Sequence, residues 1–181
     1  MIREIVTYPD PEVHEVSSSV RRTNAAELRQ LIDDMKETMS AYQGVGLAAP
    51  QIGARKRVIV VDQQGGFVVI NPKIKVLSEE TFKSEEGCLS VPGPTAVITR
   101  ANHIEVTGKF PVYSNGDLVM TDFKQEFSGF SAAIFQHEVD HLDGCLFFDH
   151  LRPMAKNMYI RKMDKQIKRG QAWRYQVATS L

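Results

Sequence analysis

Cysteine is scarce in this chain of 181 residues, which contains only Cys88 and Cys145. Two thiols do not make the disulfide framework of a small secreted domain, and we expect both to be reduced. Apolar runs such as Val58–Val61 are far shorter than the roughly 18 residues that a membrane-spanning helix needs. The first residues also lack the apolar core of a signal peptide. These absences predict a cytoplasmic protein without a membrane partner.

The chain has no net charge, because 22 basic side chains balance 22 acidic ones. The balance is uneven along the sequence: residues 151–181 contain eight basic side chains and one acidic side chain, Asp164. That segment carries a charge of +7, so residues 1–150 carry −7. A basic tail of this kind either contacts phosphates, as RNA presents them, or forms the solvated face of a packed helix.

The composition is otherwise that of one globular domain over residues 1–181, with 43% hydrophobic and 24% charged residues. Apolar residues recur at helical spacing in three segments, at about 25–42, 130–142 and 153–170. We expect Asn24 to cap the first helix, with Glu27 reaching back to its amide in a capping box. Gly144 and Gly170 are the expected stops of the other two helices.

Between the first two helices the sequence is strand-like, with β-branched and aromatic residues in short segments. The expected strands are 57–62, 67–71, 74–84, 95–100, 103–110 and 117–123. The expected turns are Gly65-Gly66, Asn71-Pro72, Pro92-Gly93-Pro94 and Asn115-Gly116. Because no long helix separates these strands, antiparallel or mixed pairing is favoured over a doubly wound parallel sheet.

The strongest chemical signal is the sequence HEVDH, which begins at His137. On a helix His137 and His141 lie one turn apart on the same side, so both imidazoles can bind one metal ion. Phe130 and Ile134 share that side, which we therefore expect to be buried and apolar. Glu138 is rotated by about 100° from the first histidine and can reach a water molecule beside the ion. This pattern predicts a metal-assisted hydrolase with a carboxylate base.

A catalytic site of this type needs a third protein ligand and an open coordination position. The patterns of helical zinc proteases do not supply it, because Phe147 stands where their third histidine would be and no Glu follows Glu138. The two thiols remain as candidates. Cys145 lies just past the expected helix end at Gly144, and Cys88 lies between a strand and a Pro-Gly-Pro turn. Spacing alone does not choose between them.

Three segments together resemble the peptide deformylase family: Gly44–Gln51 (GVGLAAPQ), Glu86–Ser90 (EGCLS) and Gln136–Gly144 (QHEVDHLDG). Their order and spacing match that family, and the similarity extends over essentially the whole chain. The resemblance implies an α+β fold, with mixed, mainly antiparallel sheets around a central metal-binding helix and a C-terminal helix. It also implies a hydrolase that removes the N-formyl group from the N-terminal formyl-methionine of newly synthesised polypeptides and releases formate.

Carried over residue by residue, the resemblance makes Cys88, His137 and His141 the ligands of one divalent metal ion. It implies Fe²⁺ in cells, although two imidazoles and a thiolate also suit Zn²⁺, Ni²⁺ or Co²⁺. Glu138 becomes the general acid and base. These roles are consistent with the chemistry, because the carboxylate can take a proton from water and return it to the leaving amine.

The remaining roles concern the oxyanion and the substrate. The resemblance implies that Gln51 and the backbone N–H of Leu89 stabilise the oxyanion. The backbone around Gly46 would pair with an extended peptide, and Arg100 would lie near the substrate. An apolar pocket for methionine would be lined by residues next to the motifs, namely Val45, Phe130, Ala133 and Ile134.

Several alternatives stay open at this level. Gln51 is also interpretable as a core amide, and Arg100 as a solvated strand residue. A deformylase-like amidase would act on another small formyl or acyl substrate. A structural metal module would add a fourth protein ligand and leave Glu138 without a role. The basic C-terminal helix at about 153–170 either contacts the ribosome, from which formylated chains emerge, or packs as an ordinary amphipathic helix; no DNA partner is expected.

Overall fold

The computed structural model describes residues 1–21, 24–63, 65–114 and 117–169. In this part of the chain the helices are α1 (Ala25–Ala41), α2 (Gly129–Leu142) and α3 (Pro153–Lys168). The strands are β1 (Gly46–Ala48), β2 (Val58–Val61), β3 (Phe67–Val76), β4 (Thr81–Cys88), β5 (Val91–Ala101), β6 (His103–Ser114) and β7 (Asp117–Ser128). Short 3-10 helices lie at Pro11–His14, Ala49–Ile52 and Phe147–His150.

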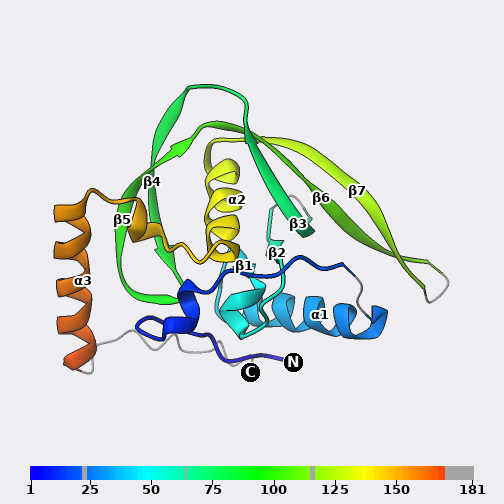
Figure 1. Ribbon diagram of the computed structural model, residues 1–181, viewed down its shortest axis with the longest axis horizontal. Coiled ribbons are helices and arrows are strands. Elements are labelled where there is room, and N and C mark those ends of the chain that lie inside the picture. Colours follow the sequence, from blue (N-terminus) through cyan, green and yellow to red (C-terminus); the bar gives the residue numbers. More distant parts are fainter. Residues whose placement is uncertain (22–23, 64, 115–116, 170–181) are drawn as a thin grey trace.

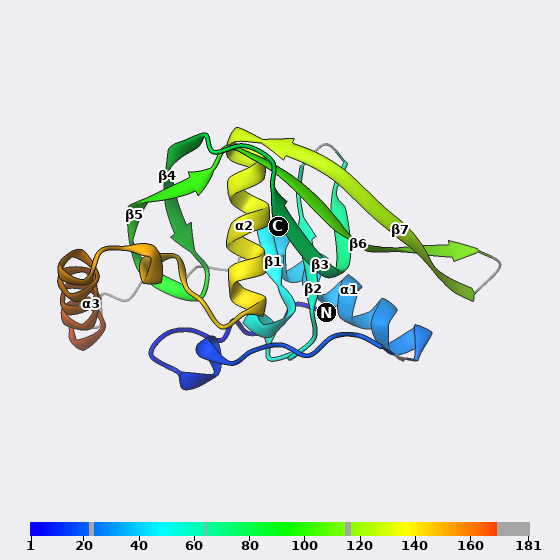
Figure 2. The same ribbon diagram turned by 45° about the horizontal axis from the view of Figure 1, so that its top comes forward.

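The strands form two sheets on either side of a central helix (Figure 1). The larger sheet has the order β1-β2-β3-β6-β7, and the smaller is the hairpin β4-β5. All these strand pairs are antiparallel, and a parallel bridge joins Ser18 to Lys56. Helix α2 contacts strands of both sheets and lies between them in Figure 2. The fold is therefore the α+β arrangement that the sequence predicted.

Strand β2 shows how the sequence sets the layers of the larger sheet. Its four residues are all buried, and alternate residues of a strand point to opposite faces. Val58 and Val60 belong to a core cluster that contains the apolar side of α1, whereas Ile59 and Val61 belong to a cluster with α2. A continuous apolar run is the pattern of a strand covered on both faces. The sheet is thus packed between α1 and α2.

The three predicted helices are present. Helix α1 follows Asn24, whose Oδ1 accepts the N–H of Ala26 at 2.8 Å. Within the described residues no hydrogen bond joins Glu27 to the Asn24 amide, so the cap is confirmed but the full capping box is not. Helix α2 ends just before Gly144, which has a φ of 71°. The predicted stop at Gly170 lies outside the described residues.

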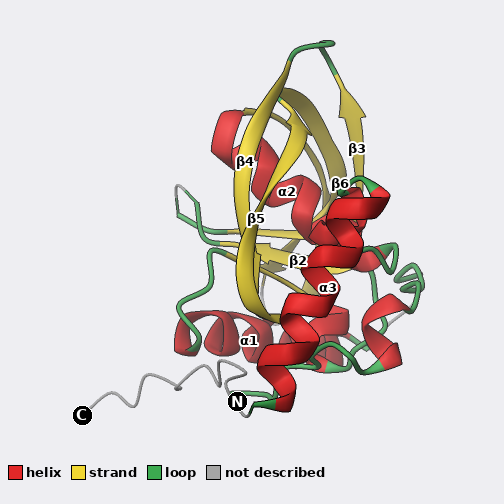
Figure 3. Cartoon of the chain, turned by 90° about the vertical axis from the view of Figure 1, so that its left-hand side faces the viewer, coloured by secondary structure: helices red, strands yellow, loops and turns green. Residues whose placement is uncertain are grey.

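Helix α3 packs on the outside of the smaller sheet (Figure 3). Tyr159 and Met163 are buried against the cluster that contains Phe147 and Phe148, and the Tyr159 hydroxyl donates to the carbonyl of Pro94 at 2.6 Å. The exposed face of α3 is basic and includes Arg161, Lys162, Lys165 and Lys168. No helix in the described residues is long and apolar enough to cross a lipid bilayer.

Two predicted turns are wrong because strands run through them. Asn71-Pro72 lies inside β3, where Asn71 has a φ of 53° and the register with β6 shifts. Pro92-Gly93-Pro94 lies inside β5, where the register with β4 shifts between Glu86 and Cys88. A proline that sits at such an irregularity does not remove a ladder hydrogen bond.

Other boundaries also differ from the predictions. The expected strand 74–84 is the end of β3 and the start of β4, separated by residues 77–80. Strand β1 was not predicted, because three residues are too few for a periodic signal. The Gly65-Gly66 turn is confirmed by positive φ values of 100° and 84°. The Asn115-Gly116 turn lies outside the described residues, between strands longer than expected.

Candidate metal centre

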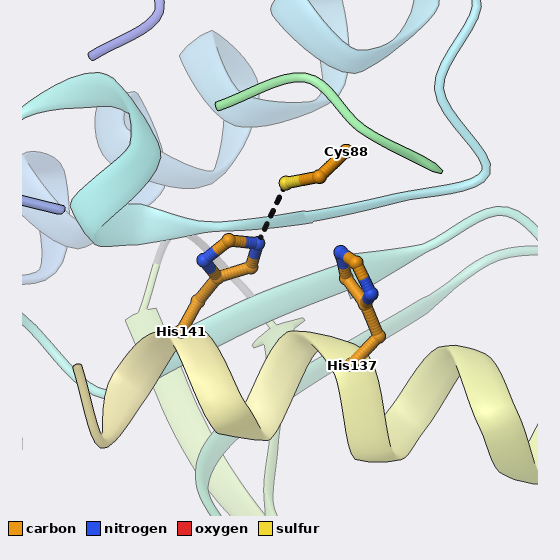
Figure 4. Close-up of side chains that lie close together, drawn as sticks. All are labelled: Cys88, His137 and His141. Atoms are coloured by element: carbon orange, nitrogen blue, oxygen red, sulfur yellow. Dashed lines mark hydrogen bonds between the residues drawn. The ribbon is translucent and has the colours of Figure 1, made fainter. Parts of the chain in front are cut away.

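Cys88, His137 and His141 lie together, the thiol at the end of β4 and the imidazoles on α2 (Figure 4). One donor atom from each lies within 4.8 Å of the others, and Cys88 Sγ is 3.1 Å from His141 Nε2. Burial lowers the pKa of His141, which favours the neutral imidazole that a ligand must present. Cys145, the competing thiol, is a half-buried residue beyond the end of α2 and is not part of this group. A sulfur and two nitrogens fit a divalent transition metal.

The register between β4 and α2 brings these side chains together. Ser84, Glu86 and Cys88 are the buried residues of the second half of β4, and the residues between them are exposed. Two residues advance a strand by roughly 6.6 Å, and four residues advance a helix by roughly 6 Å. Alternate residues of β4 therefore meet residues one turn apart on α2, and Cys88 faces His141 while Glu86 faces His137.

Glu86 orients the ring of His137. Its Oε2 lies 2.9 Å from His137 Nδ1, which leaves Nε2 of that ring to face the cluster. Arg100 donates from Nε and Nη2 to the two oxygens of Glu86, each at 2.8 Å. Burial by itself would raise the pKa of Glu86, but the hydrogen bonds from Arg100 and His137 outweigh it and lower this pKa to about 2. The carboxylate that holds His137 is thus ionised at neutral pH.

Arg100 is not among the residues that line the cavity beside the cluster, nor is it a solvated strand residue. It is 4% exposed, and its Nη1 donates to Asp140 Oδ2 at 2.6 Å. A buried guanidinium needs such paired anions, and burial is outweighed by Glu86 and Asp140, which raise the pKa of Arg100 above its usual range. His150 Nε2 lies 2.7 Å from the same Asp140 oxygen. Arg100 therefore holds the Glu86 carboxylate in place without lining the cavity beside Cys88, His137 and His141.

Glu138 is buried beside the ligand cluster. Its Oε2 has no hydrogen-bond partner among the described residues, and burial is the main cause that raises the pKa of Glu138 to about 7. A carboxyl group with this pKa can both accept and donate a proton near neutral pH. A Cβ at Gly46 would overlap the Glu138 carboxylate. Glycine is therefore required at position 46 for the carboxylate to occupy its place.

Gln51 is held next to the Cys88 sulfur. Its Oε1 accepts the N–H of Ala48 at 2.8 Å, and this bond leaves Nε2 as the outward donor. That nitrogen lies 3.2 Å from Ser90 Oγ and 3.7 Å from Cys88 Sγ. Leu89 occupies the turn after Cys88 and faces the same space. Gln51 Nε2 thus lies beside the cluster, and Leu89 lines the cavity next to it.

A cavity of about 320 Å³ opens beside the cluster. Its lining includes the predicted residues Val45, Gly46, Gln51, Leu89, Phe130, Ala133, Ile134, His137 and Glu138. Phe130 is 58% exposed, so the expectation that it is buried is wrong. It stands in the first turn of α2, at the rim of the cavity, whereas Ile134 one turn later is buried.

Sequence reasoning missed Glu86, Ser84 and Asp140. A signal for the first two was present, because they stand two and four residues before Cys88 and period-2 alternation places all three on one strand face. Asp140 lies inside the HEVDH motif but points to Arg100, and its role depends on a strand 40 positions earlier. No local pattern identifies such a partner.

Comparisons with known proteins agree with this geometry. Residues 2–157 match the family model described as polypeptide deformylase. A peptide deformylase from Cellvibrio japonicus is 39% identical over 170 residues, which cover 92% of this chain and 96% of that protein. The crystal structure of a peptide deformylase from Legionella pneumophila has a TM-score of 0.79 at 37% identity and covers 96% of this chain and 99% of its own. One from Ehrlichia chaffeensis in complex with actinonin has a TM-score of 0.78 at 35% identity, covering 91% and 97%.

Replacing Arg100 by methionine is expected to weaken metal binding by about 10- to 100-fold. This is the usual effect of losing a residue from the hydrogen-bond network around the metal ligands. The reason is that Glu86 would lose the guanidinium that keeps it ionised against His137. Competition with a chromophoric chelator measures the affinity. Because an unpaired buried carboxylate also destabilises the fold, Arg100→Lys, which keeps the charge without the two-pronged contact, should give an intermediate affinity.

Lys83→Ala is the matched control, since Lys83 lies on the exposed face of the same hairpin and only bonds Thr99 Oγ1 at 2.7 Å. We expect its metal affinity to equal that of the unmodified chain. Unchanged affinity in a folded Arg100→Met variant would contradict the support assigned to Arg100.

Proposed function

This chain belongs to the polypeptide deformylase family, metal-dependent hydrolases that remove the N-formyl group from newly made polypeptides, and we propose that Cys88, His137 and His141 hold its metal ion. The observation that carries this assignment is the convergence of their three donor atoms within 4.8 Å, beside the buried, unpartnered carboxylate of Glu138. When bound, the ion supplies Lewis-acid chemistry that polarises the formyl group and lowers the pKa of water toward about 7.

Glu138 acts as the general base and then the general acid. Its carboxylate accepts a proton from the water whose oxygen attacks the formyl carbon. The bond between that carbon and the peptide nitrogen then breaks, and Glu138 returns the proton to this nitrogen. The products are formate and a free N-terminal amine. Burial raises the pKa of Glu138 and a bound cation would lower it again, so the carboxylate is ionised before the first transfer and can take up the proton of the water.

Gln51 and Leu89 stabilise the negative charge that develops on the formyl oxygen. Gln51 Nε2 is held beside the cluster by the bond from Ala48 to Oε1, and it would exchange one of its contacts with Ser90 Oγ and Cys88 Sγ for the formyl oxygen. Leu89 follows Cys88 in the chain and lines the same cavity, so its backbone N–H is the second donor that we propose. Each preorganised donor of this kind contributes on the order of 3 kcal/mol to the transition state.

The peptide substrate binds in extended form between two strand edges. Within the described residues β1 pairs only with β2, and β4 only with β5. The cavity is lined by Val45 and Gly46, where β1 begins, and by Glu85 and Gly87 of β4. A peptide that adds to a strand edge gains backbone hydrogen bonds. The first side chain, methionine, enters the part of the cavity that is lined by Ala133 and other apolar residues of α2.

Fe²⁺ is the ion we infer for the cell, and Zn²⁺, Ni²⁺ and Co²⁺ suit the same donors. Protein purified without oxygen is expected to contain about one equivalent of iron, and exposure to air should release iron and abolish activity, because an iron–thiolate centre is oxidised. Elemental analysis before and after exposure measures this. Zinc at full occupancy in the anaerobic protein, with no iron, would contradict the choice of ion but not the choice of ligands.

Replacing Glu138 by glutamine is expected to lower turnover by at least about 100-fold, since general acid–base catalysis contributes that much. Formate release from formyl-Met-Ala-Ser measures turnover, and elemental analysis should find the metal content unchanged. Glu126→Gln, a change at an exposed carboxylate that contacts His103, is the control.

The alternatives give different results in this assay. Turnover that survives in the Glu138 variant would contradict the role of Glu138 as the general base. An amidase with another substrate would leave formyl-Met-Ala-Ser intact while hydrolysing a smaller formyl amide. A structural metal module would hydrolyse neither.

We infer a second, weaker contact between the basic face of α3 and ribosomal RNA in the cytoplasm. The helix is anchored by Tyr159 and Met163, so its exposed cations are presented outward on a fixed support. Phosphates neutralised by such cations release counterions, which makes binding depend on salt. Contact of this kind would keep the enzyme near the polypeptides that it processes.

Replacing the four exposed cations Arg161, Lys162, Lys165 and Lys168 by glutamine is expected to weaken ribosome binding. The dependence of binding on salt should also fall. The slope of log binding constant against log salt concentration should decrease by roughly one unit for each phosphate that is no longer neutralised. Sedimentation with ribosomes at several salt concentrations measures both quantities. Deformylation of a free peptide should stay constant, because the helix lies outside the cavity. Binding that remains equal at all salt concentrations would rule out the contact.

A further inference from the structure

Ser84 is a buried polar residue that neither the metal ligands nor the proposed acid–base chemistry requires. It is 5% exposed and lines the cavity beside the metal cluster. Its hydroxyl has no hydrogen bond to any described residue. Most buried hydroxyl groups in proteins have a hydrogen-bond partner. Because the Ser84 hydroxyl has none among the described residues, it is free to bind a group that enters the cavity.

The register that forms the metal centre also places Ser84. Cys88 faces His141 and Glu86 faces His137. One further step of two residues along β4 and one further turn back along α2 set Ser84 toward Ala133. Both residues are small and both line the cavity. Space therefore remains between them, at the end of the cavity away from the sulfur ligand.

The first side chain of the substrate would end in this space. The formyl group must lie at the metal cluster, so a long unbranched side chain in the cavity extends away from Cys88 along β4. The cavity lining includes the apolar residues Ala133 and Ile134 together with the hydroxyl of Ser84, and it also contains the polar residues Tyr42, Gln43, Glu85 and Glu86. The only polar atom of a methionine side chain is its sulfur, a weak acceptor. An oxidised methionine carries a much stronger acceptor, the sulfoxide oxygen, at the same place.

We propose that Ser84 is a specificity-determining residue whose hydroxyl donates a hydrogen bond to the sulfur end of the first side chain, so that the enzyme also deformylates peptides beginning with N-formylmethionine sulfoxide. This inference rests on the proposed function and deepens it. A sulfoxide transferred into a purely apolar pocket would lose its hydrogen bonds to water without replacement. The Ser84 hydroxyl supplies that replacement, and the small Ala133 side chain leaves room for the added oxygen.

The test compares three formylated tripeptides that differ only in the first side chain: methionine, methionine sulfoxide and norleucine, which has the length of methionine but no acceptor. For the holoenzyme, formate release is expected from all three. In Ser84→Ala, kcat/KM should fall roughly 5- to 100-fold for the sulfoxide, the range for the removal of one hydrogen bond. For methionine the fall should be under about 5-fold, and for norleucine kcat/KM should stay within about 2-fold.

The loss should appear in KM rather than kcat, because the bond lies away from the reacting atoms and is equally strong in the ground and transition states. Ser131→Ala is the matched control, since Ser131 is on the same helix as Ala133 but bonds Gln63 Oε1 at 3.0 Å outside the cavity. The Ser131→Ala change should alter kcat/KM for all three peptides by the same small factor.

The outcomes separate this inference from the proposed function. Equal losses for the three peptides in Ser84→Ala, or no loss for any, would overturn the role of Ser84. Turnover of the methionine peptide without turnover of the sulfoxide peptide by the unmodified enzyme would overturn the added substrate. No formate from any peptide would instead count against the deformylase activity itself.

Discussion

The packing of β4 against α2 is the constraint on which the site depends. A strand and a helix have different periods, yet two strand residues and one helical turn advance by nearly the same distance. Three successive pairings follow from this match: a ligand pair at Cys88 and His141, a support pair at Glu86 and His137, and the open space beside Ser84. A shift of one residue in β4 would turn all three side chains to the opposite face. The register therefore fixes the metal centre and the cavity together.

That register requires charged groups to be buried, and they are stable only as a set. Glu86 is held by Arg100, and Arg100 is held in turn by Asp140. Removal of one member would leave another buried charge unpaired, which costs more than the pair itself contributes. The same environment raises the pKa of Glu138, which has no such partner. A divalent cation nearby would lower this pKa again, so the ionised base becomes available when the site is loaded.

Local patterns in the sequence predicted the parts of the site that lie within one element. HEVDH on a helix placed His137, Glu138 and His141 together, and the strand-like spacing of the middle segments predicted antiparallel or mixed pairing. What failed depended on distant partners. Asn71-Pro72 has the composition of a turn, but a bulge against β6 allows β3 to continue. Arg100 has the charge of a surface residue, but two carboxylates from β4 and α2 bury it.

Cys88 illustrates the boundary between these cases. Sequence spacing did not distinguish Cys88 from Cys145 as the candidate third ligand. The distance in space between a strand residue and a helix cannot be read from a local sequence pattern. The resemblance of three motifs selected Cys88, and the fold brings it to the histidines.

Strand β1 shows how the fold keeps a binding edge available without inviting aggregation. An unpaired strand edge is a template for other chains, and proteins commonly limit such edges by making them short. In the described structure β1 has only three residues and faces a cavity instead of open solvent. Gly46 begins it, and the missing side chain is also what allows the Glu138 carboxylate to lie there. One glycine thus serves both the peptide backbone and the base, so a larger residue at position 46 would remove the binding edge and displace the proton acceptor in a single change.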